Sequence, residues 1–436
     1  MRIAINSYSN PMKAHLSDLP NGKNTYHSRP KKALLLGLTL FIATVTLHLL
    51  ADSHSKLHSS VNKVSNSTSI RRMKDCDLFR GRWLPYQNAP YYTNETCHLI
   101  IDQQNCRKFG RPDTQFLKWR WKPDRCELPL FNAYHFLELV RGKSMAFVGD
   151  SVGRNQMDSL LCLLTRVEYP VDVSHKYTSD SKFKRWFYPN YKFTVANFWA
   201  PHLVKSMSAF AKGSSFNSLM NLYLDQVEET WSAQIADFDY VIISAGHWFF
   251  RPLMFYDNGK VVGCHRCFDK NIRDLTHYYG YKKAFKTTFS TLQNLPKYQG
   301  ITFLRTFSPG HFENGSWDKG GNCPRAMPFT GREVSLADDY LEFYLIQMEE
   351  FRKAEIEGKK KGLKFIMIDT TEAMLLRPDG HPNYYGHNQD NNRTIADCVH
   401  WCLPGPIDTW NELLLQMLKM EAQKSFNKKL QKYTLW

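Results

Sequence analysis

FVGDSVGRNQ, residues 147–156, joins a short apolar segment to a helix-forming one. The apolar residues 145–148 predict a strand, and residues 157–164 predict a helix just beyond the tight Gly-Asp-Ser turn. Such a turn places the hydroxyl of Ser151 at the carboxyl end of a strand and at the positive end of a helix. Backbone N–H groups there can receive an anion or a developing oxyanion. Ser151 is therefore a candidate nucleophile.

Apolar runs typical of buried strands recur along the chain and alternate with helical patterns. We expect strands over residues 144–149, 240–246, 301–307 and 364–369, and helices that include residues 336–353 and 410–419. Strands that alternate with helices predict an α/β fold, in which a parallel sheet carries helices on both faces. Ligands of such sheets bind outside the carboxyl ends of the strands, which is where Ser151 lies.

The last helix has a start signal and an apolar face. Thr409 and Glu412 have the spacing of a capping box, which predicts that the helix begins here. We interpret the apolar stripe that follows as core packing; it consists of Trp410, Leu413, Leu414, Met417 and Leu418.

A serine nucleophile needs a neutral imidazole as its base and a carboxylate that orients the imidazole. An Asp-x-x-His sequence offers both from one loop, because residues three apart on a turn can face the same way. The pattern occurs at Asp172/His175, Asp274/His277 and Asp397/His400. Only the third pair has neighbours that would anchor it, namely two cysteines and a Leu-Pro-Gly-Pro stretch. We predict His400 as the base, the alternative being a structural histidine, and interpret the other two pairs as surface residues.

The amino-terminal hundred residues predict a membrane anchor. Residues 33–51 form an apolar run with the length of a membrane span, and more basic residues precede it than follow it. The positive-inside rule then leaves residues 1–32 cytosolic and the rest luminal. Residues 52–75 are polar and predict a flexible stem. Four glycosylation sequons lie beyond the span, at Asn66, Asn94, Asn314 and Asn392.

All ten cysteines also lie beyond the span, which predicts a set of disulfides formed in an oxidising compartment. Residues 76–141 are rich in Cys, Trp and Pro and predict a stapled, loop-built lobe, followed by a catalytic domain over 142–436. The C-x-x-C spacing of Cys264 and Cys267 would also suit zinc, but no second ligand pair accompanies it. We therefore expect no metal.

The net charge of +16 suggests a nucleic-acid ligand or another acidic partner. The basic residues are scattered and no nucleic-acid motif occurs, so we predict no nucleic-acid partner. Solvated surface charge explains most of the excess. Attraction to acidic polymers in the secretory lumen is the functional alternative.

The Gly-Asp-Ser turn and the late Asp-x-x-His pair resemble the GDSL/SGNH hydrolase superfamily. Longer strings resemble one branch of it, the plant trichome-birefringence-like family of polysaccharide O-acetyltransferases. The resemblance covers residues 75 to 425, and the strings that carry it are GDSVGRNQ at 149–156, GHWFF at 246–250, RTFSPGHFENGSW at 305–317, RPDGHPNYY at 377–385 and DCVHWCLPGPIDTWNELLL at 397–415.

The resemblance implies a Golgi type II membrane protein with Ser151 as nucleophile, His400 as base and Asp397 as its orienting partner. It also implies four disulfides, Cys76–Cys126, Cys97–Cys162, Cys106–Cys402 and Cys323–Cys398, with Cys264–Cys267 as an additional local pair. The usual Gly-x-Asn, whose Asn helps to form the oxyanion hole, is not evident in this sequence. The residues considered for oxyanion or substrate contacts are Gly149, Asp150, Arg154, Asn155, Gly246 and His247, with helix capping, bracing or packing as their alternative roles.

The predicted reaction moves an acetyl group onto a sugar hydroxyl through an acetyl-serine. Strings at 83–94 and 116–129 are most similar to members that act on xyloglucan, which favours galactosyl hydroxyls of that polymer. Alternatives are another wall polymer (xylan, mannan or pectin), an acetylesterase, or a non-catalytic wall-polymer binding protein. We expect no bound cofactor; the donor is acetyl-CoA or a derived carrier, and a membrane protein could supply it. Sugar-stacking or core roles are open for Trp119, Trp121, Trp248 and Trp401.

Overall fold

The computed structural model describes residues 76–209, 218–387 and 395–433. The predicted cytosolic tail, membrane span and stem lie outside these residues, as do the sequons at Asn66 and Asn392. Among the helices formed within the described ranges, none has the length and apolar character needed to cross a bilayer. Sequons inside the ranges are Asn94, which is half-buried, and Asn314, which is exposed.

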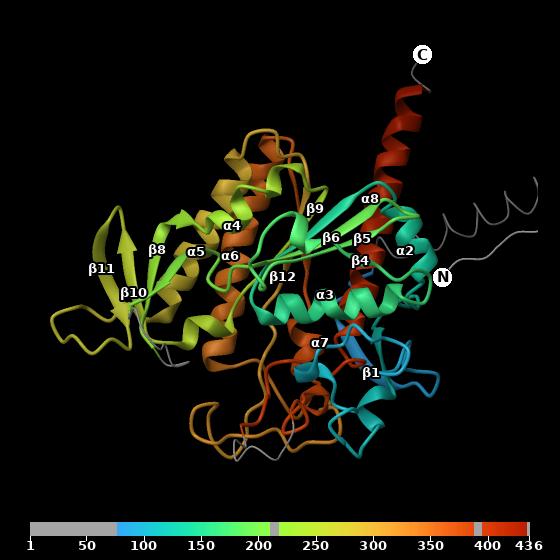
Figure 1. Ribbon diagram of the computed structural model, residues 1–436, viewed down its shortest axis with the longest axis horizontal. Coiled ribbons are helices and arrows are strands. Elements are labelled where there is room, and N and C mark those ends of the chain that lie inside the picture. Colours follow the sequence, from blue (N-terminus) through green and yellow to red (C-terminus); the bar gives the residue numbers. More distant parts are fainter. Residues whose placement is uncertain (1–75, 210–217, 388–394, 434–436) are drawn as a thin grey trace, which may run out of the picture. The chain divides into compact units, whose positions relative to one another are not determined.

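A seven-stranded sheet forms the centre of the molecule, with strand order β13-β12-β9-β3-β6-β5-β4 (Figure 1). The strands from β13 to β6 are parallel, and β5 and β4 continue the sheet antiparallel at one edge. The strands are β3 (Ser144–Gly149), β4 (Val171–Asp172), β5 (Lys184–Tyr188), β6 (Phe193–Trp199), β9 (Tyr240–Ser244), β12 (Ile301–Arg305) and β13 (Lys364–Ile368).

Helices cover both faces of this sheet, as the strand alternation predicts. Along β3, Met145 and Phe147 face one core and Ala146 and Val148 face the other, because successive side chains of a strand point to opposite sides. The helices are α2 (Ala133–Leu139), α3 (Ser151–Leu164), α4 (Glu229–Ser232), α5 (Thr276–Asn294), α6 (Asp338–Lys360), α7 (Thr371–Leu375) and α8 (Asp408–Tyr433). Residues of α2, α3 and α8 belong to the first core, and those of α5 and α6 to the second.

Two smaller sheets complete the part of the chain that the structure describes. One has the order β11-β10-β8-β7, from β7 (Val204–Ser208), β8 (Met220–Val227), β10 (Leu253–Asp257) and β11 (Lys260–His265). The other pairs β1 (Gly81–Pro85) with β2 (Trp119–Pro123) in the amino-terminal lobe. Short 3-10 turns are η1 (Asp102–Gln104), η2 (Gln115–Leu117), η3 (Ser174–Lys176), η4 (Ile235–Asp237), η5 (His247–Phe250) and η6 (Pro378–Gly380).

The structure corrects three expectations. The central sheet is mixed, because β5 and β4 return antiparallel at its edge. The helix after the turn begins at Ser151, although Ser, Gly and Asn are weak helix formers, since tertiary packing overrides propensity. The capping box is wrong: α8 begins at Asp408, whose carboxylate accepts the Gly405 N–H, while Glu412 binds the Tyr91 hydroxyl. The apolar stripe of α8 packs in the first core.

Candidate active site

Ser151 lies at the carboxyl end of β3, where the order of strands in the sheet reverses direction. β3 pairs with β6 on one side and with β9 on the other, and open α/β sheets bind ligands at such a switch point. Gly149 is required in this turn, since its φ is +152° and a Cβ atom would overlap the Ser244 carbonyl oxygen. The chain therefore reverses tightly enough to leave the serine at the sheet edge.

Asp150 fixes the turn through three hydrogen bonds to backbone N–H groups. Its Oδ1 accepts the N–H groups of Val152 (3.0 Å) and Gly153 (3.3 Å), which caps α3. Its Oδ2 accepts the Gly246 N–H at 3.0 Å, which joins the ends of β3 and β9. The interpretation of Asp150 as a helix-stabilising residue is confirmed.

The structure brings the three predicted catalytic residues together. The Ser151 hydroxyl lies 2.6 Å from Nε2 of His400, and Nδ1 of His400 donates to Oδ2 of Asp397 at 2.7 Å. Oδ1 of Asp397 accepts the backbone N–H groups of Val399 and His400. The side chains of His400 and Asp397 keep 22% and 28% of their surface exposed, so substrate can reach the imidazole edge. This geometry suits a serine nucleophile with its general base.

The electrostatics of the pair favour an imidazolium beside a carboxylate. Burial disfavours protonation of His400, but the charge and hydrogen bond of Asp397 outweigh it and raise the pKa of His400. Burial also opposes ionisation of Asp397, yet the His400 charge and three hydrogen bonds hold its pKa well below the usual range. Asp397 therefore stays ionised while His400 gains and loses a proton.

Disulfides anchor the loop that carries Asp397 and His400. Cys398 is bonded to Cys323, and Cys402 is bonded to Cys106 of the amino-terminal lobe. The structure also contains the other three pairs that the resemblance implied, Cys76–Cys126, Cys97–Cys162 and Cys264–Cys267. The last of these bonds joins the two cysteines of the C-x-x-C sequence to each other.

Asn155 clamps the same loop onto α3. Its Oδ1 accepts the Trp401 N–H at 2.8 Å, and its Nδ2 donates to the Trp401 carbonyl at 3.3 Å. The side chain is fully buried. Because both ends of the amide are used on the residue next to His400, Asn155 braces the His400 loop and its amide is not free for the oxyanion role considered for it.

His381 supports His400 from the other side, and the sequence patterns assigned it no role. Its Nδ1 donates to the His400 carbonyl at 2.6 Å, and its ring stacks on Trp401 at 4.1 Å between centroids. Nε2 of His381 lies 2.7 Å from Nδ1 of His311, whose Nε2 donates to the Leu375 carbonyl. The sequence did contain an indication, because the RPDGHPNYY string carries part of the family resemblance. It does not reveal which groups its histidine contacts.

A buried ion pair lies in the same string, just before His381. Arg377 donates to both carboxylate oxygens of Asp379, and neither side chain has exposed surface. Arg111 of the amino-terminal lobe donates to the backbone carbonyls of Asp379 and His381. The lobe thus reaches the catalytic loop through hydrogen bonds as well as through the Cys106–Cys402 disulfide.

Gly246 and His247 lie at the end of β9, beside the turn, and the Gly246 N–H and Nε2 of His247 already have partners. The Gly246 N–H is used by Asp150, and a Cβ atom on Gly246 would overlap the Phe307 ring. Nε2 of His247 donates to the Ser308 carbonyl at 2.8 Å. Burial lowers the pKa of His247 to about 4, so the ring is neutral at physiological pH.

Among the residues considered for oxyanion or substrate contacts, Arg154 keeps the most hydrogen-bond donors without a partner in the described ranges. Its guanidinium lies 5.8 Å from the Trp199 ring, and its charge opposes protonation of His400. Its Nε has no hydrogen-bond partner within the described ranges. Of the four tryptophans considered for sugar stacking, Trp121 and Trp401 are core residues, whereas Trp119 and Trp248 are half-buried.

The two other Asp-x-x-His pairs lie apart from Ser151. His175 is exposed, as expected. The surface interpretation of His277 is wrong: it is only 7% exposed, with Nδ1 3.2 Å from Nε2 of His265. It is buried because α5 begins here and packs against β11 and α6, a tertiary contact that local sequence does not reveal.

Comparisons with known proteins agree with this architecture. Residues 128–417 match the PC-esterase family, described as the GDSL/SGNH-like acyl-esterase family found in Pmr5 and Cas1p. Residues 74–127 match the PMR5 N-terminal domain. The fold and site thus define a GDSL/SGNH-like acyl-esterase-type protein.

The relatives place the chain more narrowly. It is 49% identical to protein trichome birefringence-like 19 of Arabidopsis thaliana, over 91% of this chain and 95% of that protein. It is 42% identical to xyloglucan O-acetyltransferase 4 of Populus trichocarpa, over 90% and 92%. It is 40% identical to xyloglucan O-acetyltransferase 2 of Arabidopsis thaliana, over 79% and 83%. The chain belongs to the trichome birefringence-like family.

Proposed function

We propose that this protein is a plant polysaccharide O-acetyltransferase that works through an acetyl-serine on Ser151. The observation that carries the proposal is the continuous hydrogen-bonded series from Ser151 through His400 to Asp397. Relatives that share two fifths of its sequence over most of its length are named xyloglucan O-acetyltransferases. These names favour transfer of acetyl groups over their removal.

In the first half-reaction, Ser151 takes the acetyl group from its donor. His400 removes the hydroxyl proton as Oγ attacks the acetyl carbonyl carbon, and then gives that proton to the leaving group of the donor. Asp397 holds Nδ1–H of His400, so Nε2 stays the basic nitrogen facing Oγ. Because only neutral His400 is a base, the rate should rise with pH through its pKa, which lies above 6.5.

The tetrahedral oxyanion needs donors, and two remain at the turn. The first amides of a helix lack intrahelical partners, and Asp150 uses those of Val152 and Gly153, which leaves the Ser151 N–H. The Arg154 side chain is the second donor we propose. In the second half-reaction a sugar hydroxyl gives its proton to His400 and attacks the acetyl ester, and Ser151 regains its proton from His400.

For the acceptor we propose galactosyl hydroxyls of xyloglucan, in line with the names of the relatives. The donor is acetyl-CoA or a carrier derived from it, delivered at the membrane. For the location we propose the Golgi, with a single amino-terminal anchor and the catalytic domain in the lumen. The five disulfides support this location, because structural disulfides persist in oxidising compartments.

The test is an acetyl-transfer assay with the purified full chain. Acetyl-CoA, or an activated acetyl ester in its place, is supplied with xyloglucan oligosaccharides and, separately, with xylan, mannan and pectin fragments. We expect acetylated xyloglucan product from the wild type and a loss on the order of 10⁵-fold in Ser151→Ala. An acetyl-enzyme trapped on the wild type and absent from Ser151→Ala would identify the intermediate.

Three results would contradict the proposal. Acetylated product from another polymer alone would reassign the acceptor. Release of acetate from pre-acetylated glycan without transfer would make the protein an esterase. Polysaccharide binding without chemistry in wild type and Ser151→Ala alike would make it a binding protein.

A further inference from the structure

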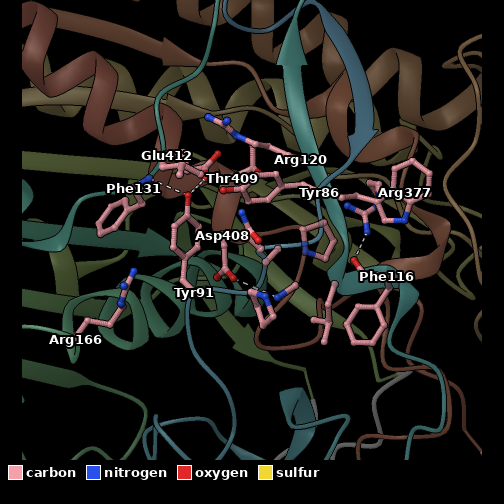
Figure 2. A pocket seen from close by; sticks show the side chains of 18 residues that line it. Tyr86, Tyr91, Phe116, Arg120, Phe131, Arg166, Arg377, Asp408, Thr409 and Glu412 are labelled. Carbon is pink, nitrogen blue, oxygen red and sulfur yellow. Dashed lines mark hydrogen bonds between the residues drawn. The ribbon is translucent and has the colours of Figure 1, made fainter.

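A cavity of about 350 Å³ lies away from Ser151, between the amino-terminal lobe and the start of α8 (Figure 2). One side is formed by Tyr86, Tyr91 and Trp119 of the lobe, and the other by Pro406 and Glu412. Its volume falls within the range of about 300–1,000 Å³ that is typical of ligand pockets. The cavity is therefore large enough for a small ligand or one part of a larger ligand.

The cavity is distant from the nucleophile but connected to it by one helix. Asp408, which lines the cavity, accepts a hydrogen bond of 2.6 Å from Ser159 on α3. Ser159 is eight residues beyond Ser151, which corresponds to about 12 Å along the helix. A ligand that reached from the cavity to Ser151 would have to be an oligomer or a polymer.

The side chains around the cavity combine aromatic rings with hydrogen-bonding groups. Tyr86 and Trp119 are half-buried, and the Arg120 guanidinium lies 5.6 Å from the Tyr86 ring. Such a mixture of flat apolar faces and fixed polar groups suits a pyranose ring, which has C–H faces and a rim of hydroxyls.

Several polar atoms of the lining residues have no partner. Within the described ranges, Nε1 of Trp119, Nε of Arg120 and Oε2 of Glu412 make no hydrogen bond, although each is buried. Tyr91 donates to the other Glu412 oxygen and accepts the Phe131 N–H, as Figure 2 shows. A buried polar group without a partner gains a hydrogen bond when a ligand supplies one, so these atoms are available to a ligand in the cavity.

The charges facing the cavity favour a neutral ligand. Asp408 and Glu412 are both buried acids, at 6% and 3% exposure. Burial raises the pKa of Glu412 to about 7, so it exchanges a proton near neutrality and can donate to or accept from a hydroxyl. The lining also contains Arg120 and Arg166, which balance the two acids, and Arg377, which is paired with Asp379. The cavity therefore carries little net charge, as suits a neutral ligand.

We propose that this cavity is a remote subsite that binds a neutral, non-reacting sugar residue of the acceptor polysaccharide. The inference rests on the proposed function for the identity of the polymer. A subsite at this distance would hold the chain while another residue of it reaches the acetyl-serine, and so would favour long acceptors over short ones.

The test measures binding and catalysis separately. Binding of a xyloglucan oligosaccharide is titrated calorimetrically against the full chain carrying Ser151→Ala, alone and combined with Tyr86→Ala or Trp119→Phe. Matched controls are Tyr134→Ala, an exposed tyrosine of α2, and Trp186→Phe, which lies outside the cavity and whose Nε1 also has no partner among the residues that the structure describes. We expect Kd to rise at least tenfold with Tyr86→Ala and severalfold with Trp119→Phe, and to stay within twofold in the controls.

In the otherwise wild-type chain, Tyr86→Ala should raise KM for the oligosaccharide about tenfold and leave kcat within twofold. Thermal melting shows whether each variant folds. If Tyr86→Ala does not fold, the Kd of Trp119→Phe tests the subsite. Unchanged Kd in both variants, no binding to the Ser151→Ala chain, or tighter binding of an oligogalacturonide through the same residues would each overturn the subsite. Absence of acetyl transfer with intact Tyr86-dependent binding would refute the proposed function alone.

Discussion

The serine site and the remote cavity satisfy their polar groups in different ways. Around Ser151, the hydroxyl, both nitrogens of His400 and both oxygens of Asp397 have partners within hydrogen-bond distance. Around the cavity, buried atoms of four lining residues (Trp119, Arg120, Arg377 and Glu412) lack partners among the described residues. The first place is organised before substrate arrives, as catalysis of charge development requires. The second keeps its bonding capacity for a ligand.

The largest expected effect comes from breaking the hydrogen-bonded series. Asp397→Asn should lower kcat about 10⁴-fold, because a neutral amide does not hold His400 in the tautomer that accepts the serine proton. Stopped assays of acetyl transfer measure it. Asp172→Asn, at the same spacing from a histidine (the exposed His175), is the control and should retain activity. A loss below tenfold in Asp397→Asn would rule out its orienting role.

Removing the cross-link that anchors the catalytic loop should cost the most stability. Cys106→Ser with Cys402→Ser opens a loop of 296 residues and should lower the free energy of unfolding by about 3–5 kcal/mol. Cys264→Ser with Cys267→Ser, which opens a loop of three residues, should cost about 1–2 kcal/mol. Denaturant titration compares the two. Equal losses would mean that chain entropy is not the cause.

Removing the Asn155 hydrogen bonds that hold the His400 loop should lower kcat without changing substrate binding. Asn155→Ala removes two hydrogen bonds to the Trp401 backbone and lets His400 shift, so kcat should fall about 10²-fold with KM nearly unchanged. Asn427→Ala, at an exposed position of α8, is the control. A rise in KM with constant kcat would instead place Asn155 in substrate binding.

The smallest expected effect is on the pH dependence of the unfolding free energy, through Glu412 at the cavity. The pKa of Glu412 is about 7 in the folded protein against 4.5 as its reference, because burial favours the neutral form. Its contribution to stability is therefore present below pH 4.5 and is lost as pH rises through 7.

Glu412→Gln cannot ionise, so relative to wild type it should gain about 2 kcal/mol in unfolding free energy between pH 5 and pH 8. Denaturant titrations at the two pH values measure the gain. The same difference at both values would show that Glu412 does not titrate in this interval.

Local patterns were sufficient to place the strands and to single out the Asp-x-x-His pair whose histidine lies beside Ser151. The runs at 144–149, 240–246, 301–307 and 364–369 correspond to β3, β9, β12 and β13 with ends shifted by at most two residues. Their apolar content reflects burial on both faces, which is a local signal. The cysteines and prolines around His400 are likewise visible in sequence, since they mark an anchored loop.

Contacts between distant segments were not visible in the same way. His381 touches the base through a backbone carbonyl, and Asn155 clamps Trp401 across 246 positions of chain. Neither contact leaves a local pattern, because each depends on two segments meeting in three dimensions. The burial of His277 and the Glu412–Tyr91 bond escaped prediction for the same reason.

The sequence by itself determined the α/β alternation, the turn that presents Ser151 and the loop that carries its base, since each follows from short-range residue order. Only the tertiary structure decided which hydrogen-bonding groups have partners. It committed Asn155, Gly246 and His247 to other partners and left Trp119 and Glu412 with unused capacity beside a cavity. The physical reason is that a hydrogen bond needs two groups at one distance and angle, and only packing brings remote groups to that geometry.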